Sequence, residues 1–447
     1  MSLMQRSTAR VQKLFKSKFV RDTLVLQAGK LVLFVVSVAT FVIVFRELGA
    51  EQYGIYQLAI NLHGIILTFN ILGYGQSTIT QMAEAVGAQD RDEVRNLMGF
   101  FMQMALLVGV LSFGVSLFAP AFSQAANDNS YIGELTRLYA VMIFMRPIFN
   151  LTLIALQSIR AMAAYSYLEN AANLIESGLK IGAALLGWGA LGIIVAYVVA
   201  YAIKAVLSLA VYVYYQRRRP EILPPVSDVL GKIGRVSVRP YMGFGVSVAL
   251  DKNLAGLYTS LPLQFVGMWA GEAAAGFLSL AIKALSYPAL FFTGVLTNLE
   301  VRFPADVGAG DFVRLQDNMR RVLRWTVPIA VLGYGAFAIF APLLVPILDE
   351  EAIPAIDVVR VLCLYGAITG IGGIFGPLYR TLRLVRVNMV IKIVSLLAAA
   401  LPAFWLIQHA GAIGGAWTVN LIYGLSVALT VIVVWSRLRG LAAAQAI

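Results

Sequence analysis

A small set of ionisable side chains lies inside long apolar stretches of the chain. The basic members of this set are Lys30, Arg146, Lys180, Lys204, Lys252 and Lys283, and the acidic members are Glu176 and Asp251. Charged groups deep in a membrane are energetically costly, and they generally line a cavity or pair with one another. Because arginine can hold a phosphate through two hydrogen bonds and lysine acts as a point charge, the basic excess predicts an anion-binding cavity. We assign this cationic wall to Lys30, Lys252, Lys283 and Arg146.

The two acidic members differ in their neighbours along the chain. Glu176 and Lys180 are four residues apart, so they face the same side of a helix and are interpreted as a structural ion pair. Asp251 and Lys252 are adjacent, hence about 100° apart around a helix, and do not automatically neutralise each other. Lys392 lies close enough to the end of a span to extend to the interface and is given no function. Residues considered for cavity lining or ion coupling are Asp251, Lys204, Asn61 and His63.

The remaining side chains offer little for catalysis. One cysteine, Cys363, excludes an intrachain disulfide, and two histidines leave little room for a catalytic metal. The chain has no G-x-x-x-x-G-K-[ST] phosphate loop, no H-E-x-x-H and no G-x-S-x-G motif. We therefore expect neither an enzyme nor a cofactor, and no direct pumping by ATP hydrolysis within this chain.

The composition is that of a membrane protein. Of the 447 residues, 60% are hydrophobic and 13% are charged, against about 45–50% and about 25% in soluble domains. A helix needs about 20 mainly apolar residues to cross a bilayer. Twelve segments qualify: 23–45, 53–80, 96–118, 134–158, 168–187, 190–215, 242–267, 274–299, 323–347, 356–379, 387–408 and 411–435. Prolines expected to break the helices within or near these spans are Pro147, Pro262, Pro288 and Pro328.

The basic residues indicate how these spans are oriented. With the N-terminus inside, 25 of the 35 Lys and Arg residues fall in cytoplasmic segments and one, Arg46, falls outside. This asymmetry is typical of cytoplasmic loops, so both termini are predicted to be cytoplasmic. The net charge of +12 is accordingly a signal of topology, and no nucleic-acid partner is expected.

Short sequence patterns recur in the two halves of the chain. Residues 54–60 match 276–282, Phe118-Ala119-Pro120 recurs as Phe340-Ala341-Pro342, and Lys30 matches Lys252, all at an offset of 222. The spacing from Arg137 to Arg160 recurs from Arg360 to Arg383, at an offset of 223. Six helices per half give both halves the same orientation, and many transporters are built from such repeats.

The predicted fold is an all-α polytopic membrane protein with twelve spans in two pseudo-twofold-related six-helix lobes around a central cavity. Lys30 and Lys252 would face that cavity from opposite walls. The predicted parts are an amphipathic cytoplasmic segment at 1–22, an N-lobe at 23–215, a basic linker at 216–241, a C-lobe at 242–436 and a cytoplasmic tail at 437–447.

Three motifs resemble a known family of transporters. They are Leu48-Gly49-Ala50-Glu51-Gln52-Tyr53-Gly54-Ile55-Tyr56, then Leu72-Gly73…Gln76…Ala83-Glu84, and Ala270-Gly271-Glu272…Gly276-Phe277. In these motifs the chain resembles the Wzx-type polysaccharide transporters of the multidrug/oligosaccharidyl-lipid/polysaccharide exporter superfamily. The resemblance implies flipping of polyprenyl-pyrophosphate oligosaccharides across the bacterial cytoplasmic membrane for O-antigen, capsule or exopolysaccharide assembly. It also implies a cavity lined mainly by the first, second, seventh and eighth helices, and as partners the glycan polymerase and chain-length machinery.

Other functions fit parts of the pattern. A multidrug/cation antiporter of the same superfamily would require buried carboxylates, which are scarce here. A major-facilitator-type transporter also has twelve helices in two parallel halves, and residues 87–91 faintly match its usual loop. A membrane scaffold for glycan assembly is the alternative without transport.

Overall fold

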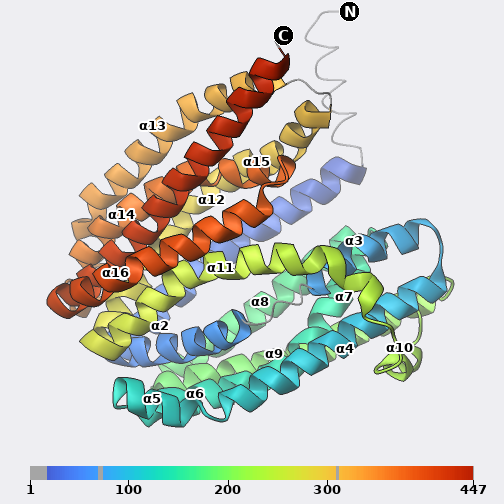
Figure 1. The fold of residues 1–447 in the computed structure, drawn as a ribbon. Helices are drawn as coiled ribbons and strands as arrows, with labels where there is room; N and C mark the ends of the chain where they lie inside the picture. Colours follow the sequence, from blue (N-terminus) through green and yellow to red (C-terminus); the bar gives the residue numbers. More distant parts are fainter. Residues whose placement is uncertain (1–17, 69–73, 309–311, 446–447) are drawn as a thin grey trace, which may run out of the picture. The chain divides into compact units, whose positions relative to one another are not determined.

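The computed structural model describes residues 18–68, 74–308 and 312–445 and shows no strand in these ranges (Figure 1). The helices of the first half are α2 (Lys18–Thr68), α3 (Tyr74–Gly87), α4 (Arg91–Ser116), α5 (Ala119–Asn127), α6 (Ser130–Ala140), the 3₁₀ helix η1 (Val141–Phe144), α7 (Arg146–Ser158), α8 (Met162–Leu185), α9 (Gly189–Arg218) and α10 (Val226–Lys232). Those of the second half are α11 (Arg239–Ala270), α12 (Glu272–Gly308), α13 (Phe312–Leu344), η2 (Glu350–Ala352), α14 (Ala355–Gly372), α15 (Phe375–Thr381) and α16 (Val385–Gln445). Most of the predicted amphipathic segment at 1–22 lies outside the described residues.

The predicted membrane spans lie mainly on helices; among the described residues, the exceptions are short turns at 117–118, 145, 186–187, 345–347 and 373–374. Seven helical segments in the described ranges are long and apolar enough to cross a membrane. Val385–Leu441 contains two predicted spans, 387–408 and 411–435, and Val32–Thr68 covers parts of two, 23–45 and 53–80. The predicted spans at 168–187, 242–267 and 274–299 coincide with α8, α11 and α12. The chain is a multi-pass all-α membrane protein, as its composition predicts.

Prolines affect the helices less than expected. The predicted fourth span is broken, because α6 gives way to the 3₁₀ helix η1 and α7 then begins with Pro147 in its first turn. By contrast, α11 continues through Pro262 and α13 through Pro328, so the breaks expected there are wrong. Pro288 likewise lies inside α12 without ending it. Membrane helices tolerate proline where neighbouring helices satisfy the backbone groups that it frees.

The internal repeat is visible in the backbone. Gly49 and Gly271 both have positive φ (67° and 89°), and so do Gly189 and Gly411 (61° and 52°), each pair at an offset of 222. Arg160 and Arg383 have φ of 58° and 57°, an uncommon left-handed conformation for arginine, at an offset of 223. The same irregularities therefore stand at matching places in the two halves.

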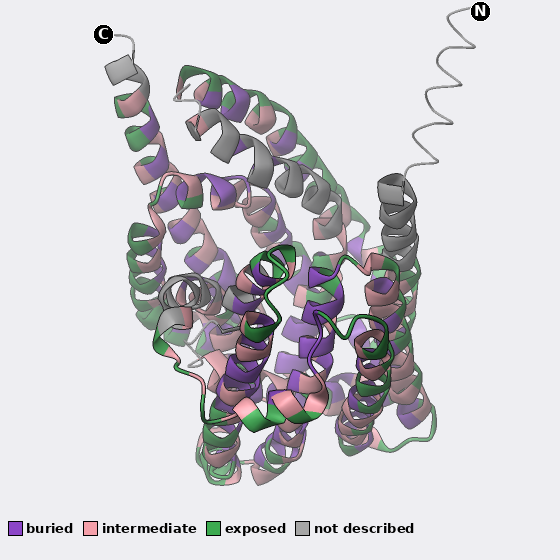
Figure 2. Cartoon of the chain, turned by 90° about the vertical axis from the view of Figure 1, so that its right-hand side faces the viewer, coloured by how far each residue is buried: buried purple, intermediate pink, exposed green. Residues whose placement is uncertain are grey.

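Contacts divide the chain into two compact units. Unit 1 comprises Met1–Glu47, Leu72–Val115 and Arg137–Gly245, and unit 2 comprises Leu48–Ile71, Ser116–Thr136 and Val246–Ile447. These units do not follow the lobe boundaries expected from the sequence, which stay a prediction. Buried and exposed residues alternate along most helices (Figure 2).

The segment interpreted as a linker is a packed part of unit 1. Ile222, Leu223 and Val229 are buried in the same hydrophobic core as residues of α4, α7 and α9. The hydroxyl of Tyr212 donates a hydrogen bond of 2.6 Å to the carbonyl of Pro224. The basic segment between the halves is thus held against the membrane helices and does not act as a loose tether.

Candidate functional site

Unit 1 contains a buried ion cluster between α8 and α9. The carboxylate of Glu176 lies 2.6 Å from Lys180 Nζ and 2.5 Å from Lys204 Nζ. Glu176 and Lys180 are on one helix, four residues apart, as the sequence spacing indicates, whereas Lys204 comes from α9. One carboxylate therefore faces two ammonium groups, and the cluster has a positive excess.

Aromatic rings surround these ammonium groups. Lys180 Nζ lies 3.9 Å from the ring centroid of Tyr197, and Lys204 Nζ lies 4.7 Å from that of Tyr201. The ring of Tyr139 packs edge-on against Tyr197, with 5.3 Å between centroids. Such cation–π contacts stabilise a charge that has lost water. They account for two lysines beside a single carboxylate.

Arg146 adds a further positive charge to unit 1. It is the first residue of α7, directly after the helix break, and is exposed. No carboxylate among the described residues lies within ion-pair distance of it, although it is near enough to the hydroxyls of Tyr139 and Tyr201 to act on them electrostatically. Tyr201 also borders Lys204, so Arg146 and the lysine cluster share an aromatic neighbour. A guanidinium in the middle of a predicted span is suited to bind an anion.

The buried carboxylate of unit 2 has different partners. Asp251 of α11 accepts hydrogen bonds from Lys392 Nζ (2.7 Å), Asn388 Nδ2 (2.9 Å) and Tyr379 Oη (2.5 Å). These partners lie on α15 and α16, more than 100 residues away in sequence. Lys392 is buried, with 8% of the residue exposed, so the expectation that it extends to the interface is wrong.

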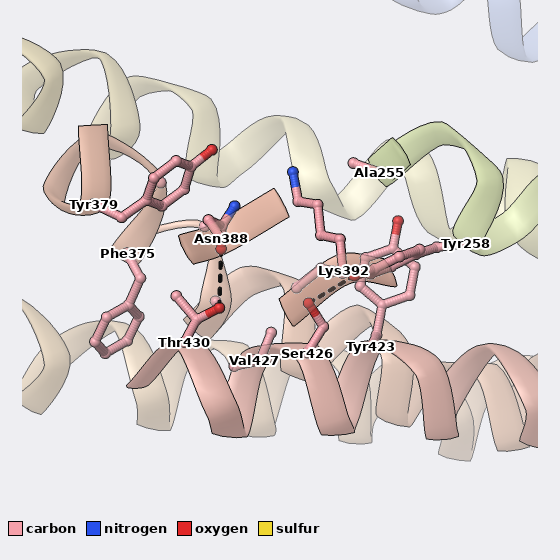
Figure 3. A pocket seen from close by; sticks show the side chains of 14 residues that line it. Ala255, Tyr258, Phe375, Tyr379, Asn388, Lys392, Tyr423, Ser426, Val427 and Thr430 are labelled. Atoms are coloured by element: carbon pink, nitrogen blue, oxygen red, sulfur yellow. Dashed lines mark hydrogen bonds between the residues drawn. The ribbon is translucent and has the colours of Figure 1, made fainter. Parts of the chain in front are cut away.

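A cavity lies beside this cluster. Its volume is about 270 Å³, and its lining includes Tyr258, Asn388, Lys392, Ser426 and Thr430 (Figure 3). The Tyr258 hydroxyl donates to Ser426 Oγ at 2.8 Å, and Thr430 donates to Asn388 Oδ1 at 3.1 Å. The polar wall is thus largely hydrogen-bonded within itself.

Helix α2 is joined to α11 within unit 2 by polar contacts. Asn61 Nδ2 donates to the carbonyl of Ser260 at 2.8 Å, and Asn253 Nδ2 donates to the carbonyl of Thr68 at 2.9 Å. Asn61, expected to line a cavity or take part in coupling, therefore contacts α11. His63, the second α2 residue in that set, is buried with 1% of its surface exposed.

Two glycines bring α2 and α12 into backbone contact. A Cβ built on Gly54 would overlap the carbonyl oxygen of Glu272, and a Cβ built on Gly276 would overlap the carbonyl oxygen of Ala50. Gly54 and Gly276 are 222 residues apart, and so are Ala50 and Glu272, so the two halves contribute equivalent residues to this contact. We call this contact, between residues 50–54 and 272–276, the glycine crossing. Small residues allow membrane helices to approach this closely.

The side chains of Lys30 and Lys252 lie outside the described residues, so their facing across a cavity stays a prediction. Lys283 is exposed on α12, with Nζ 5.8 Å from the ring centroid of Tyr287. In the described part of the chain, no three His, Cys, Asp or Glu side chains are grouped to hold a metal ion. The structure brings together Glu176 with Lys180 and Lys204, and separately Asp251 with residues to which the sequence analysis assigned no function.

Comparisons with known proteins agree with this architecture. The family described as "Polysaccharide biosynthesis protein" matches residues 19–305. A probable multidrug resistance protein, NorM of Rhizobium meliloti (strain 1021), is 24% identical over 351 residues, which cover 75% of this chain and 72% of that protein.

Solved structures with a similar fold are also transporters. An inward-facing multidrug resistance MATE family transporter of the MOP superfamily has a TM-score of 0.70 at 16% identity, covering 92% of this chain and 94% of its own. A MOP superfamily transporter from Pyrococcus furiosus Vc1 (DSM3638), described as having a binding pocket of reverse polarity, has a TM-score of 0.61 at 17% identity. The match covers 94% of this chain and 95% of that transporter. At these identities the structures establish the fold.

Proposed function

Because the chain belongs to the polysaccharide biosynthesis protein family of the MOP superfamily of membrane transporters, we propose that it is a lipid-linked oligosaccharide flippase. Its substrate is a polyprenyl-pyrophosphate oligosaccharide, which it moves from the cytoplasmic to the outer face of the bacterial cytoplasmic membrane by alternating access. The product is used for surface polysaccharide, as O-antigen, capsule or exopolysaccharide. Both termini are cytoplasmic, and a glycan polymerase with its chain-length machinery acts on the product.

The observation that carries this proposal is the charge balance inside unit 1. Lys180 and Lys204 share one carboxylate, Glu176, and Arg146 lies within ion-pair distance of no carboxylate among the described residues. A pyrophosphate is strongly anionic and a sugar chain has many polar groups, so neither crosses a bilayer unaided. A basic surface shields the pyrophosphate while the polyprenyl chain stays in the lipid. We propose that Arg146 grips the phosphate oxygens, and that Lys30, Lys252 and Lys283 extend the basic surface.

The membrane potential favours this direction of transport. Moving negative charge outward across an inside-negative membrane releases roughly 2.3 kcal/mol per charge per 100 mV. An anionic headgroup is therefore driven toward the outer face without a coupled ion. A cation substrate would be opposed by the same field.

The proposal is tested in proteoliposomes with a polyprenyl pyrophosphate that carries a fluorescently labelled oligosaccharide. Flipping is measured as the fraction of label that a membrane-impermeant quencher reaches. Charge-assisted hydrogen bonds contribute about 1.5–3 kcal/mol each, so Arg146→Gln is expected to slow flipping at low substrate by about tenfold or more. Arg146→Lys should retain part of the rate, because it keeps the charge.

The matched control is Arg360→Gln. Arg360 is an exposed arginine that is ion-paired with Asp357 at 3.2 Å, and its replacement should leave flipping unchanged. Wild-type vesicles without flipping would refute the function, and an unimpaired Arg146→Gln would refute the role of Arg146. The double change Lys30→Ala, Lys252→Ala tests the remaining basic wall in the same assay, and an unimpaired rate would refute its role.

A multidrug/cation antiporter is the second candidate, favoured by the similarity to the NorM protein. Such a transporter would present buried carboxylates to its substrate. The two carboxylates predicted to lie deep in spans, Glu176 and Asp251, are both paired with lysines. Efflux of a fluorescent organic cation from the same vesicles, driven by a proton or sodium gradient, would support this candidate instead.

A further inference from the structure

The ammonium of Lys392 is bound by oxygen atoms of a single residue. Its Nζ lies 2.7 Å from Asp251 Oδ1 and 2.7 Å from the backbone carbonyl oxygen of Asp251. Both side chains are buried, with 10% of Lys392 and 8% of Asp251 exposed. The lysine thus enters from α16 and places its charge on α11.

The other partners of Asp251 complete a neutral cluster. Tyr379 and Asn388 donate to the two carboxylate oxygens, and Thr430 donates to the amide oxygen of Asn388. Each oxygen of the carboxylate has a donor, and the single negative charge is matched by a single positive charge. Carboxylate and carbonyl oxygens are also the ligands that hard metal cations take.

The cavity of about 270 Å³ borders this cluster, and Tyr379, Asn388 and Lys392 are among its lining residues (Figure 3). Its wall carries the hydroxyl-bearing residues Tyr258, Ser426 and Thr430. A cavity of this size whose wall carries hydroxyl groups has room for several waters, each of which takes about 30 Å³ in the liquid. A small hydrated ion could therefore reach Asp251 if the ammonium were absent.

We infer that the Asp251 cluster is a monovalent-cation site that the chain fills with its own lysine. The wild-type protein takes no diffusible cation there, because the Lys392 ammonium already occupies the position between the carboxylate and the carbonyl. Removal of the ammonium opens the site to small cations such as Na⁺, NH₄⁺ or methylammonium. This inference does not depend on the identity of the transported substrate.

Unit 1 offers a matched control. Glu176 has two lysine partners, so Lys204→Ala leaves it neutralised by Lys180. Lys204 is as deeply buried as Lys392, with 2% of the residue exposed. The same truncation in unit 1 therefore creates a void without creating an unpaired carboxylate.

One further basic residue lies near the Asp251 cluster. The guanidinium of Arg380 is 5.9 Å from the ring centroid of Tyr379 and is exposed. It stands at the end of α15, outside the cavity lining. The experiment must therefore show that a diffusible ion, and not Arg380, compensates the carboxylate.

The experiment measures the thermal unfolding midpoint of the purified full-length chain in detergent, in NaCl or in choline chloride at equal ionic strength. Lys392→Ala should have a low midpoint in choline that rises by roughly 2–5 °C in NaCl, as expected for a ligand that binds only the folded state. Methylammonium should restore the midpoint as well, whereas tetramethylammonium, which has no N–H donor, should not. Lys392→Met keeps the aliphatic stem and removes only the ammonium, so it gives the same comparison if the alanine variant does not fold.

Three outcomes would overturn the inference. The first is a wild-type unfolding midpoint that is higher in NaCl than in choline chloride, together with no such difference in the Asp251→Asn variant. The second is the absence of any response to Na⁺, NH₄⁺ and methylammonium in both Lys392 variants. The third is an equal response in Lys204→Ala, which would show a general effect of truncation.

Discussion

The glycine crossing makes a prediction about the conformational equilibrium of the transporter. Replacing Gly54 by alanine adds one methyl group, and its Cβ would overlap the carbonyl oxygen of Glu272. This obstacle is backbone and not a flexible side chain, so the two segments must separate for the methyl to fit. Gly276→Ala makes the reciprocal change against Ala50. Both variants should favour the conformation in which α2 and α12 are apart at the crossing.

The expected size of the shift follows from overpacking. A methyl group forced into a well-packed contact costs about 1–3 kcal/mol, which corresponds to a shift of roughly 5- to 150-fold in a two-state equilibrium. Alanine gains up to about 1 kcal/mol over glycine within a helix. That gain is independent of the crossing, and Gly64→Ala measures it, because a Cβ on Gly64 meets nothing within 4 Å.

The assay is the labelling rate of Ala50→Cys by a membrane-impermeant maleimide. Ala50 is buried, with 7% of its surface exposed, and the native Cys363 is also buried, with 5% exposed, so both should react slowly in the parent chain. Gly54→Ala and Gly276→Ala should raise the labelling rate of Ala50→Cys, and Gly64→Ala should not. Equal labelling rates in the Ala50→Cys parent and in its three glycine variants would refute the proposal that the glycine crossing is a contact that opens.

Two further predictions concern charged groups. Removing both Lys180 and Lys204 leaves Glu176 buried and unpaired, so the double alanine variant should lose about 3–5 kcal/mol of unfolding free energy. Each single alanine variant should lose clearly less. The free energies are measured by denaturant unfolding in detergent. A single variant as unstable as the double variant would contradict the shared pairing. Tyr241, outside the predicted spans, donates to Glu93 at 3.0 Å, and burial together with this hydrogen bond raises the pKa of Tyr241 from its ordinary value of 10 to about 12. A raised pKa stabilises the fold below pH 10, and this contribution is lost as the pH rises from 10 to 12. Tyr241→Phe should therefore reduce the loss of thermal stability between pH 10 and pH 12. A pH profile of thermal stability that is the same in Tyr241→Phe and wild type would contradict the role of Tyr241.

The sequence predicted the repeat because the features that carry it are local. A left-handed turn at Gly49, Arg160 or Gly189 is set by a few neighbouring residues and recurs where those residues recur. The spans were predictable for the same reason, since length and hydropathy are properties of one segment. Local patterns of this kind also gave the ion pair of Glu176 with Lys180.

The Asp251 cluster could not be predicted in this way. Its partners lie on two other helices, and Lys392 is 141 residues from Asp251. Proximity to the end of a span made Lys392 look able to reach the interface, although helix packing turns it inward. The one available signal was that Asp251 lacked a basic partner three or four residues away on its own helix.

Three of the charged residues inside the membrane, Arg146, Glu176 and Asp251, do not follow the repeat, whereas Lys30 recurs as Lys252. At the offset of 223 that relates Arg137 to Arg360 and Arg160 to Arg383, Arg146 corresponds to Thr369. At the offset of 222, Glu176 corresponds to Ala398 and Asp251 to Gly29. The glycines and the left-handed turns recur, because each half must build the same six-helix frame. Arg146, Glu176 and Asp251 stand in one half only, so they serve tasks that the two halves do not share, which we take to be anion binding in unit 1 and the internal cation in unit 2.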